Sequence, residues 1–197
     1  MKTCRTCLLS FALALVFLLP PRATAQQGWF ATLYGGHFTD NKLLKILFQG
    51  DIVHLDLEDS YLVTLSLSRE FARWKRYIAF ELEGQIGRHF GLQDNWEFNA
   101  LVVFRWLPFP WDRYLDTSFA FGEGLSYATE EPFIESDFQD SDSVQFMNYI
   151  LLEFEFALPK VPHWSLLTRL HHRSGIFGAF GTGEGSNFVG LGVRYRF

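Results

Sequence analysis

The sequence predicts an all-β chain that folds into an eight-stranded antiparallel transmembrane β-barrel. Three observations lead to this prediction: strictly alternating segments, an aromatic content of 18%, and a final segment with one apolar face. In that segment Val189, Leu191, Val193, Tyr195 and Phe197 share one side and glycines and arginines the other, because strand side chains alternate. An apolar exterior around a polar interior is typical of a transmembrane strand and is the reverse of a soluble barrel.

Four strand candidates occupy the first half of the chain. They span residues 29–37, 61–68, 77–88 and 96–106. Each is a run of alternating apolar and polar residues, which is the pattern of a strand with two different faces. The long polar connection 38–60 contains KLLKILF at 42–48, which we expect either to form one or two helical turns or to extend a hairpin above the membrane.

Four further candidates complete the set, at 114–127, 144–156, 164–174 and 189–197. Eight strands make the smallest common barrel of this kind, in which side chains fill the interior and leave no aqueous pore. The residues predicted to face inward include both signs of charge. The acidic ones are Glu81, Glu83, Glu97, Asp116, Glu153 and Glu155, and the basic ones are Arg105, Arg169, Arg173, Arg194 and Arg196. We therefore expect a plug of ion pairs inside the barrel.

The connections alternate between short and long, which predicts how the barrel lies in a membrane. With both termini in the periplasm, 70–76, 107–113 and 159–162 become short turns, and 38–60, 128–142 and 175–185 become longer external loops. The tryptophans at the predicted periplasmic ends are Trp29, Trp74, Trp106, Trp111 and Trp164, with Trp96 at the other end. Because indole rings gather at membrane interfaces, this distribution predicts an aromatic girdle.

The amino-terminal residues 1–25 have the pattern of a cleaved signal peptide, which leaves one barrel domain at 26–197. Lys2 and Arg5 precede an apolar run, and Ala-Thr-Ala at 23–25 offers the small residues that a signal peptidase requires. The apolar run is too short to span a bilayer as a helix. The sequence therefore predicts export from the cytoplasm.

Composition excludes several classes of function. Both cysteines, Cys4 and Cys7, lie in the predicted signal peptide, so we expect neither a disulfide scaffold nor thiol chemistry. The formal net charge is −5 and becomes more negative without the signal, which disfavours nucleic-acid binding. No cofactor motif is evident, and the prediction is that the protein uses none.

The strand candidate 164–174 carries the one constellation that suggests a reaction. Arg169 and Arg173 belong in the polar interior, so His172 and Ser174 point outward near the outer-leaflet end. Residues two apart on a strand are separated by roughly 6.6 Å along the backbone, close enough for an imidazole nitrogen to reach a hydroxyl. A histidine that takes a serine proton produces an acyl-transfer nucleophile. The simpler alternative is that both are ordinary interfacial residues.

A zinc site is disfavoured although His171 and His172 are adjacent. They point to opposite faces of a strand, and no cysteine or third well-placed histidine accompanies them. The acidic segment with Glu130, Glu131, Glu135, Asp137, Asp140 and Asp142 is expected to be a solvated external loop. The alternative for this segment is a set of divalent cations that bridge lipopolysaccharide phosphates.

The last 35 or so residues resemble a known family. His-x-Ser at His172 and Ser174, a glycine-rich outer loop and a final strand ending in Tyr-Arg-Phe are similar to the PagL-type lipid A 3-O-deacylases of Gram-negative outer membranes. The resemblance implies an outer-membrane esterase that removes an ester-linked 3-hydroxyacyl chain from lipid A of lipopolysaccharide. It also implies that Ser174 is the nucleophile, His172 the general base, and Glu184 the acid that orients the histidine.

Two features of this chain depart from the family pattern. Gly175 stands where the family has an asparagine that helps to hold the oxyanion, and Glu184 lies about two residues nearer the serine than the family spacing, where Ser186 stands. Asn187 or backbone N–H groups around Gly175 are alternative oxyanion donors. Glu123, which alternation places on the lipid face unless a flanking glycine marks a bulge, is the alternative acid.

The ending of the chain points to a further partner. An aromatic-x-Phe terminus on a barrel strand resembles the signal by which bacterial outer-membrane barrels are recognised for assembly, so Phe197 implies contact with the barrel-assembly machinery. Three other functions stay open beside the deacylase: a non-enzymatic barrel with a structural or docking role, another lipid A enzyme such as an acyltransferase, and a soluble lipocalin-like carrier. The predicted location is the Gram-negative outer membrane.

Overall fold

The computed structural model of the protein describes residues 28–48, 54–137, 143–176, 179–180 and 185–197. The predicted signal peptide and Glu184 lie outside these ranges. Within them no helix is long and apolar enough to cross a membrane.

Eight strands and two short helices make up the described chain. The strands are β1 (Trp29–Thr39), β2 (Leu57–Trp74), β3 (Ile78–Gly91), β4 (Trp96–Trp106), β5 (Asp116–Ala128), β6 (Phe146–Ala157), β7 (Trp164–Ser174) and β8 (Asn187–Arg196), and the helices are α2 (Leu43–Phe48) and α3 (Phe133–Asp137). All eight predicted strands are therefore present. The KLLKILF segment forms a helix rather than a hairpin extension.

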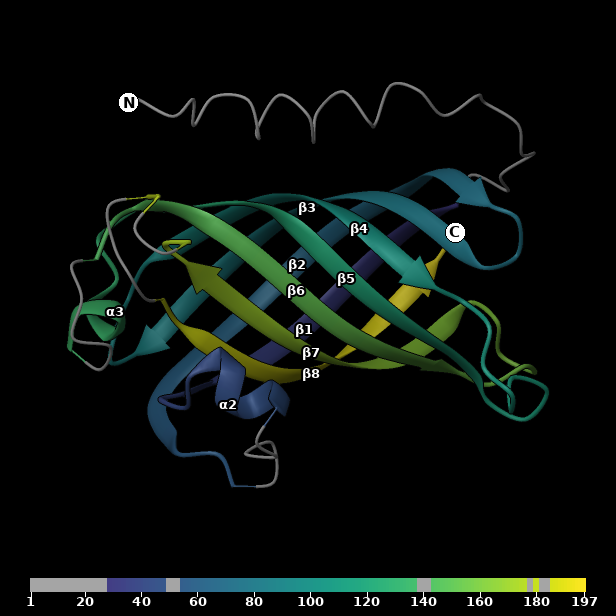
Figure 1. Ribbon diagram of the computed structural model, residues 1–197, viewed down its shortest axis with the longest axis horizontal. Helices are drawn as coiled ribbons and strands as arrows, with labels where there is room; N and C mark the ends of the chain where they lie inside the picture. Colours follow the sequence, from purple (N-terminus) through teal and green to yellow (C-terminus); the bar gives the residue numbers. More distant parts are fainter. Residues whose placement is uncertain (1–27, 49–53, 138–142, 177–178, 181–184) are drawn as a thin grey trace, which may run out of the picture.

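The strands form a closed antiparallel barrel in sequence order. Each strand pairs with the next, and β8 returns to β1 with Phe30 opposite Arg196 and Thr39 opposite Asn187. The carboxyl terminus lies at the same end as the connections β2–β3, β4–β5 and β6–β7, while α3 lies at the opposite end, as does the short β3–β4 connection at 92–95 (Figure 1). We call these the turn end and the loop end. The predicted fold class is confirmed.

Strand β2 is longer than the sequence pattern indicated. Its alternating core was evident at 61–68, whereas the strand spans Leu57–Trp74. At the turn end the charged side chains Glu70 and Arg73 continue the strand instead of ending it, because they pair with each other at 2.5 Å. A register shift between Glu70 and Ala72 accommodates them.

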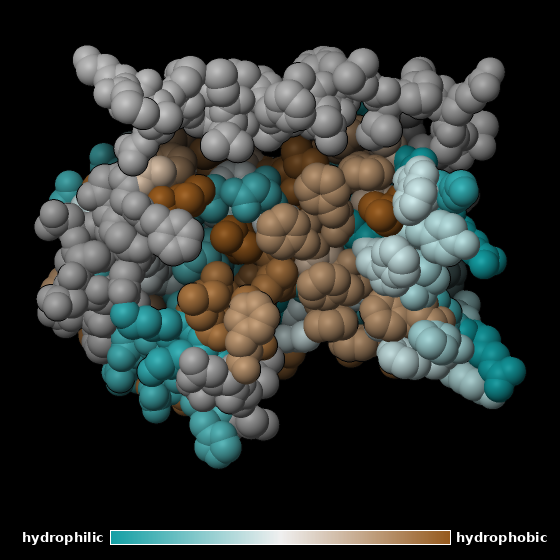
Figure 2. Space-filling model, viewed as in Figure 1, coloured by the Kyte–Doolittle hydropathy of each residue, from teal (hydrophilic) through white to brown (hydrophobic). Residues whose placement is uncertain are grey.

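The outer wall of the barrel is apolar. Leu191, Leu166 and Leu82 are 74%, 65% and 59% exposed, as expected for side chains that face lipid instead of water. A band of hydrophobic side chains crosses the middle of the barrel wall, with polar residues toward both ends (Figure 2). Trp74 and Trp106 end their strands at the turn end, as the predicted aromatic girdle requires.

The interior is filled by ion pairs, as predicted. Arg169 lies 2.5 Å from Glu153 and 3.0 Å from Glu83, and Arg105 lies 2.8 Å from both Glu81 and Glu153. All of these side chains are buried. Burial of charges is costly unless they are paired and hydrogen-bonded, so this network determines which residues the inward positions tolerate.

Candidate functional site

His172 and Ser174 lie on the outward face of β7, close to its loop end. In the sheet His172 is opposite Ile150 of β6 and Asn187 of β8, while Ser174 is opposite Asn148 of β6. Their neighbour Arg173 points inward, as alternation predicted. His172 is nevertheless only 8% exposed. The site is therefore a covered polar patch on a lipid-facing wall.

The imidazole of His172 has a fixed orientation. Its Nδ1 lies 2.8 Å from Oδ1 of Asn187, and Nδ2 of Asn187 donates to the carbonyl of Asn41 at 3.0 Å. Because a carbonyl only accepts, the Asn41 contact identifies the atom that faces His172 as the amide oxygen. His172 must then donate from Nδ1, which leaves Nε2 as an acceptor, the tautomer that a general base requires.

The hydroxyl of Ser174 is contacted by the backbone that follows it. The N–H of Ile176 donates to Ser174 Oγ at 3.2 Å, and Ile176 itself has a φ of 44°. A β-branched residue in this left-handed region is strained, and such residues persist where surrounding contacts hold them, often at functional sites. No hydrogen bond joins His172 to Ser174 in the described chain.

The described chain places an amide, not a carboxylate, against His172. Glu184, the predicted acid, falls outside the described residues. Asn187, considered above as an oxyanion donor, has its amide nitrogen engaged by Asn41 and its oxygen by His172. Among the described residues, Asn187 is thus the one that orients the histidine.

Glu123 lies on the outward face of β5, two strands from His172, with Ile150 between them. The pairing of β5 with both neighbours continues without a shift through Gly122, Glu123 and Gly124, so no bulge turns the carboxylate inward. A Cβ at Gly124 would collide with the backbone of β4, which explains that glycine by close packing. The polar neighbour of the Glu123 carboxyl is Asn148.

The acidic segment is not simply a solvated loop. Glu135 of α3 is buried; it accepts hydrogen bonds from Arg173 and Ser186, both at 2.9 Å. Burial raises the pKa of Glu135, and Arg173 and Ser186 offset part of that rise. Among the residues that the structure describes, no cluster of three or more histidines or acids could hold a metal ion. Asp140 and Asp142 fall outside those residues.

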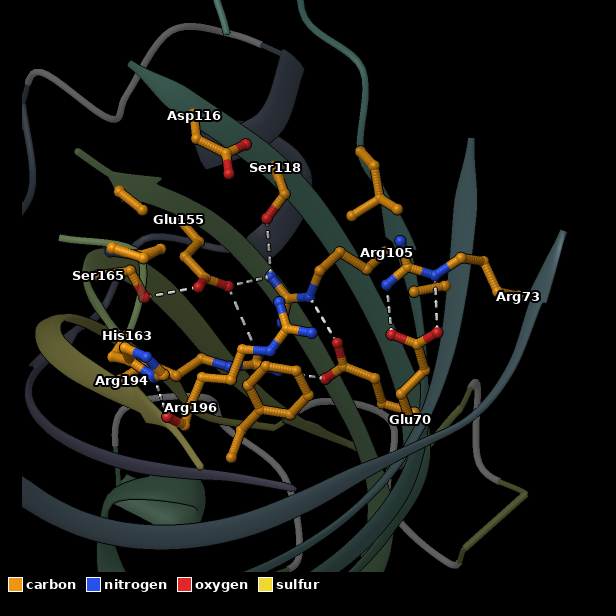
Figure 3. Close-up of a pocket in the computed structure, with 16 residues that line it drawn as sticks. Glu70, Arg73, Arg105, Asp116, Ser118, Glu155, His163, Ser165, Arg194 and Arg196 are labelled. Atoms are coloured by element: carbon orange, nitrogen blue, oxygen red, sulfur yellow. Dashed lines mark hydrogen bonds and ion pairs between the residues drawn. The ribbon is translucent and has the colours of Figure 1, made fainter. Parts of the chain in front are cut away.

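A pocket of about 110 Å³ opens at the turn end of the barrel (Figure 3). Its lining residues Ser165 and Arg194 lie at the end of the β7–β8 pairing opposite to His172. Arg105, Arg194, Glu81 and Glu155 line it, and these side chains already pair with one another. The pocket is the open end of the interior ion network. It lacks the outward exposure that an enzyme acting on a membrane lipid needs.

The comparisons place this fold among bacterial outer-membrane barrels. No protein-family model and no curated protein sequence matches the chain. Among solved structures, the outer membrane enzyme PagL is similar at a TM-score of 0.54 and 10% identity, over 84% of this chain and 98% of that one. Neisserial surface protein A has a TM-score of 0.52 and 10% identity, over 86% and 97% of the two chains.

A third similar structure broadens the class. The N-terminal β-barrel domain of Pseudomonas aeruginosa OprF has a TM-score of 0.51 and 13% identity, over 87% of this chain and all of that domain. The likeness to these three structures is one of fold. The chain is thus an eight-stranded barrel of the outer-membrane type, a class that includes an enzyme.

The sequence pointed to His172, Ser174, Asn187 and the backbone N–H groups around Gly175, but not to the contact of Asn187 with His172 or to that of the Ile176 N–H with Ser174. Asn187 lies two residues before Val189 on the last strand, so by alternation its side chain faces outward as that of Val189 does. It is opposite His172 of β7. Its outward direction was readable from the alternation. The contact with Ile176 depends on the local turn after Gly175, where the N–H of Phe180 donates to the Gly175 carbonyl at 3.1 Å, and no sequence pattern indicates it.

Proposed function

We propose that this protein is an outer-membrane ester hydrolase that removes an ester-linked 3-hydroxyacyl chain from lipid A. The single observation that carries the proposal is the 2.8 Å contact between His172 and Asn187. It leaves Nε2 of His172 as a proton acceptor on the face that also holds Ser174. The resemblance to the PagL-type deacylases, which rests on His172, Ser174 and the Tyr-Arg-Phe ending, supplies the substrate class.

The location of the site supports a lipid substrate. In the proposed orientation the turn end faces the periplasm, the loop end faces outward, and residues 1–25 are a signal peptide removed on export. His172 and Ser174 then lie on the lipid-facing wall at the level of the outer leaflet. Acyl chains already in the bilayer reach Ser174 laterally, and the lipid A headgroup sits at the loop end.

The residues divide the reaction between them. His172 Nε2 takes the proton of Ser174 as Oγ forms a bond to the ester carbonyl carbon, and the carbonyl electrons move to its oxygen. Collapse of this intermediate breaks the ester bond, and the leaving sugar oxygen takes the proton from His172. Water, deprotonated in turn by His172, attacks the acyl-serine. The acyl–Oγ bond then breaks, Ser174 Oγ takes the proton back from His172, and the 3-hydroxy fatty acid is released. The Ile176 N–H, which contacts Ser174 Oγ, is positioned to donate to the oxyanion.

The last strand supports assembly in the outer membrane. The N–H of Phe197 donates to the carbonyl of Trp29 at 3.0 Å, which closes the barrel at its seam. The rings of Phe197 and Tyr195 lie 5.6 Å apart, edge to face. This aromatic pair is the segment that we propose the barrel-assembly machinery binds.

Mass spectrometry of lipid A tests the proposal. A Gram-negative host expresses the wild type, Ser174→Ala, His172→Ala, and the control Thr168→Val, which changes a polar residue on the same face of β7. Barrel assembly is checked by heat-modifiable gel mobility. We expect lipid A to lose one 3-hydroxyacyl group with the wild type and with Thr168→Val only. A gain in mass would indicate an acyltransferase, and unchanged lipid A with assembled barrels would favour a structural or docking role.

A further inference from the structure

Asn148 of β6 lies directly opposite Ser174 in the sheet. Directly opposed residues of antiparallel strands have Cβ atoms about 4.5–5.5 Å apart and share one face. Asn148 therefore belongs to the same outward patch as the proposed nucleophile. It approaches that nucleophile from β6, whereas Asn187 approaches His172 from β8.

The side chain of Asn148 is buried without a partner for its donor. Asn148 is 4% exposed, and within the described chain its amide nitrogen makes no hydrogen bond. An unsatisfied buried donor costs about 1–3 kcal/mol, and such a group in a native structure calls for a specific explanation. A ligand atom that accepts the hydrogen bond would remove this cost.

The surroundings of Asn148 limit what that ligand atom is. The segment after Ser174 folds back over β6, since the ring of Phe180 lies 5.8 Å from that of Phe146. The Glu123 carboxyl on β5 is the polar side chain that interacts with the Asn148 amide. The amide, which has two N–H donors, thus lies between an apolar cover, this carboxyl and Ser174, beside any group that reacts with Ser174.

We propose that Asn148 Nδ2 is an oxyanion donor of the ester hydrolase. This inference rests on the proposed function. As Ser174 Oγ bonds to the acyl carbon, the carbonyl electrons move to oxygen, and that oxygen accepts hydrogen bonds from Asn148 Nδ2 and from the Ile176 N–H. Donors that meet the charge only as it develops lower the barrier without tightening substrate binding.

Asn187 is less suited to this task. Its amide nitrogen already donates to the Asn41 carbonyl at 3.0 Å and its amide oxygen lies against His172 at 2.8 Å, so both ends of this amide have a partner. Gly175 has no side chain to donate. Asn148 supplies from the neighbouring strand what Gly175, directly after the serine, lacks.

Steady-state kinetics on purified barrels with lipid A in detergent micelles test this role. The variants are Asn148→Leu, Asn148→Ala, Ser174→Ala and the control Thr168→Val. We expect Asn148→Leu and Asn148→Ala to lower kcat by roughly 10²- to 10³-fold with KM nearly unchanged, as for the loss of one oxyanion donor. Thr168→Val keeps full activity. A loss that appears in KM alone would overturn the assignment.

The controls separate this inference from the function on which it rests. If the wild type releases fatty acid, Ser174→Ala does not, and both Asn148 variants keep wild-type kcat, then Asn148 is not an oxyanion donor although the hydrolase stands. If the wild type and Ser174→Ala release equally little, the proposed function itself fails, and the Asn148 assignment fails with it. Gel mobility identifies any variant that does not assemble. If one Asn148 variant fails to assemble, the kcat of the other Asn148 variant tests the assignment.

Discussion

His172 Nδ1 donates to Asn187 Oδ1 across 2.8 Å, and this pair joins β7 to β8 on the outward face of the barrel. An amide in this position orients the imidazole and selects its tautomer, as the asparagine does in the Cys-His-Asn arrangement of papain-like proteases. Unlike a carboxylate, it adds no negative charge to stabilise the protonated histidine. In the proposed mechanism, catalysis therefore depends on the geometry of the Asn41–Asn187–His172 chain of hydrogen bonds.

Asn187→Leu tests this dependence. The change removes the acceptor while keeping a side chain of similar size, so Nδ1 and Nε2 of His172 compete for the proton. We expect kcat on lipid A to fall by roughly 10²- to 10⁴-fold, the range attributed to general acid–base catalysis. The matched control is Val189→Ala, on the same face of β8 two residues away. Equal rates for the two variants would rule out an orienting role for Asn187.

Helix α2 provides a second prediction, about access to the site. Leu44 and Phe48 are 64% and 79% exposed, whereas Ile46 is buried. Apolar side chains on a helix beside a membrane are expected to enter the interfacial region. The double variant Leu44→Ser, Phe48→Ser should therefore turn over lipid A in vesicles several-fold more slowly, yet match the wild type in detergent micelles. An equal loss in both media would contradict this membrane contact.

The interior ion network makes a prediction about stability. Arg169→Leu leaves Glu153 and Glu83 buried without the partner that lies 2.5 Å and 3.0 Å from them. We expect the free energy of unfolding in lipid vesicles to fall by about 3–5 kcal/mol, measured by urea titration with gel mobility as the readout. The control is Arg76→Leu, because the Arg76 guanidinium lies over the Tyr77 ring at 5.4 Å rather than within the interior network. A urea midpoint of unfolding that Arg169→Leu leaves unchanged would show that the ion network is not needed for stability.

Glu135 predicts a dependence on pH. Burial raises the pKa of this carboxyl, so the folded protein binds the proton more tightly than the unfolded chain does. The resulting stability is present below the ordinary pKa of a glutamate and is lost as the pH rises through the raised value. Glu135→Gln mimics the protonated form and removes this dependence.

Urea unfolding at about pH 4 and about pH 8, on either side of the ordinary pKa of a glutamate, measures the difference. We expect Glu135→Gln to become more stable relative to the wild type as the pH rises from about 4 to about 8. The quantity compared is the difference between their free energies of unfolding at each pH. The opposite sign would indicate that the ion pair of Glu135 with Arg173, at 2.9 Å, outweighs the burial of the charge.

The barrel was predictable because the lipid requires apolar side chains on the outer face of each strand and the polar interior requires polar or charged side chains on the inner face. Leu166 and Arg169 illustrate the rule on a single strand, one 65% exposed and the other 1%. The full length of β2 was not predictable, because Glu70 and Arg73 extend the strand by pairing with each other. The burial of Glu135 was also missed, since it depends on Arg173 reaching it from β7.

The candidate site was predictable only in part, for a similar reason. The parity of Arg169 and Arg173 placed His172 and Ser174 outward. The orientation of Asn187 depends on a hydrogen bond to Asn41, 146 residues away in sequence, and the place of Asn148 opposite Ser174 depends on the register between β6 and β7. Alternation assigns a residue to a face of the sheet, but it does not give the register that brings each amide beside its partner on β7.

The most direct measurement of the central claim is covalent labelling of the purified barrel with a long-chain alkyl fluorophosphonate, read by intact mass and peptide mapping. If His172 accepts the Ser174 proton, one adduct forms on the wild type, maps to Ser174, and is strongly reduced in His172→Ala and absent from Ser174→Ala. The control Thr168→Val labels like the wild type. An assembled wild-type barrel that stays unlabelled, or labels equally without His172, would contradict the account.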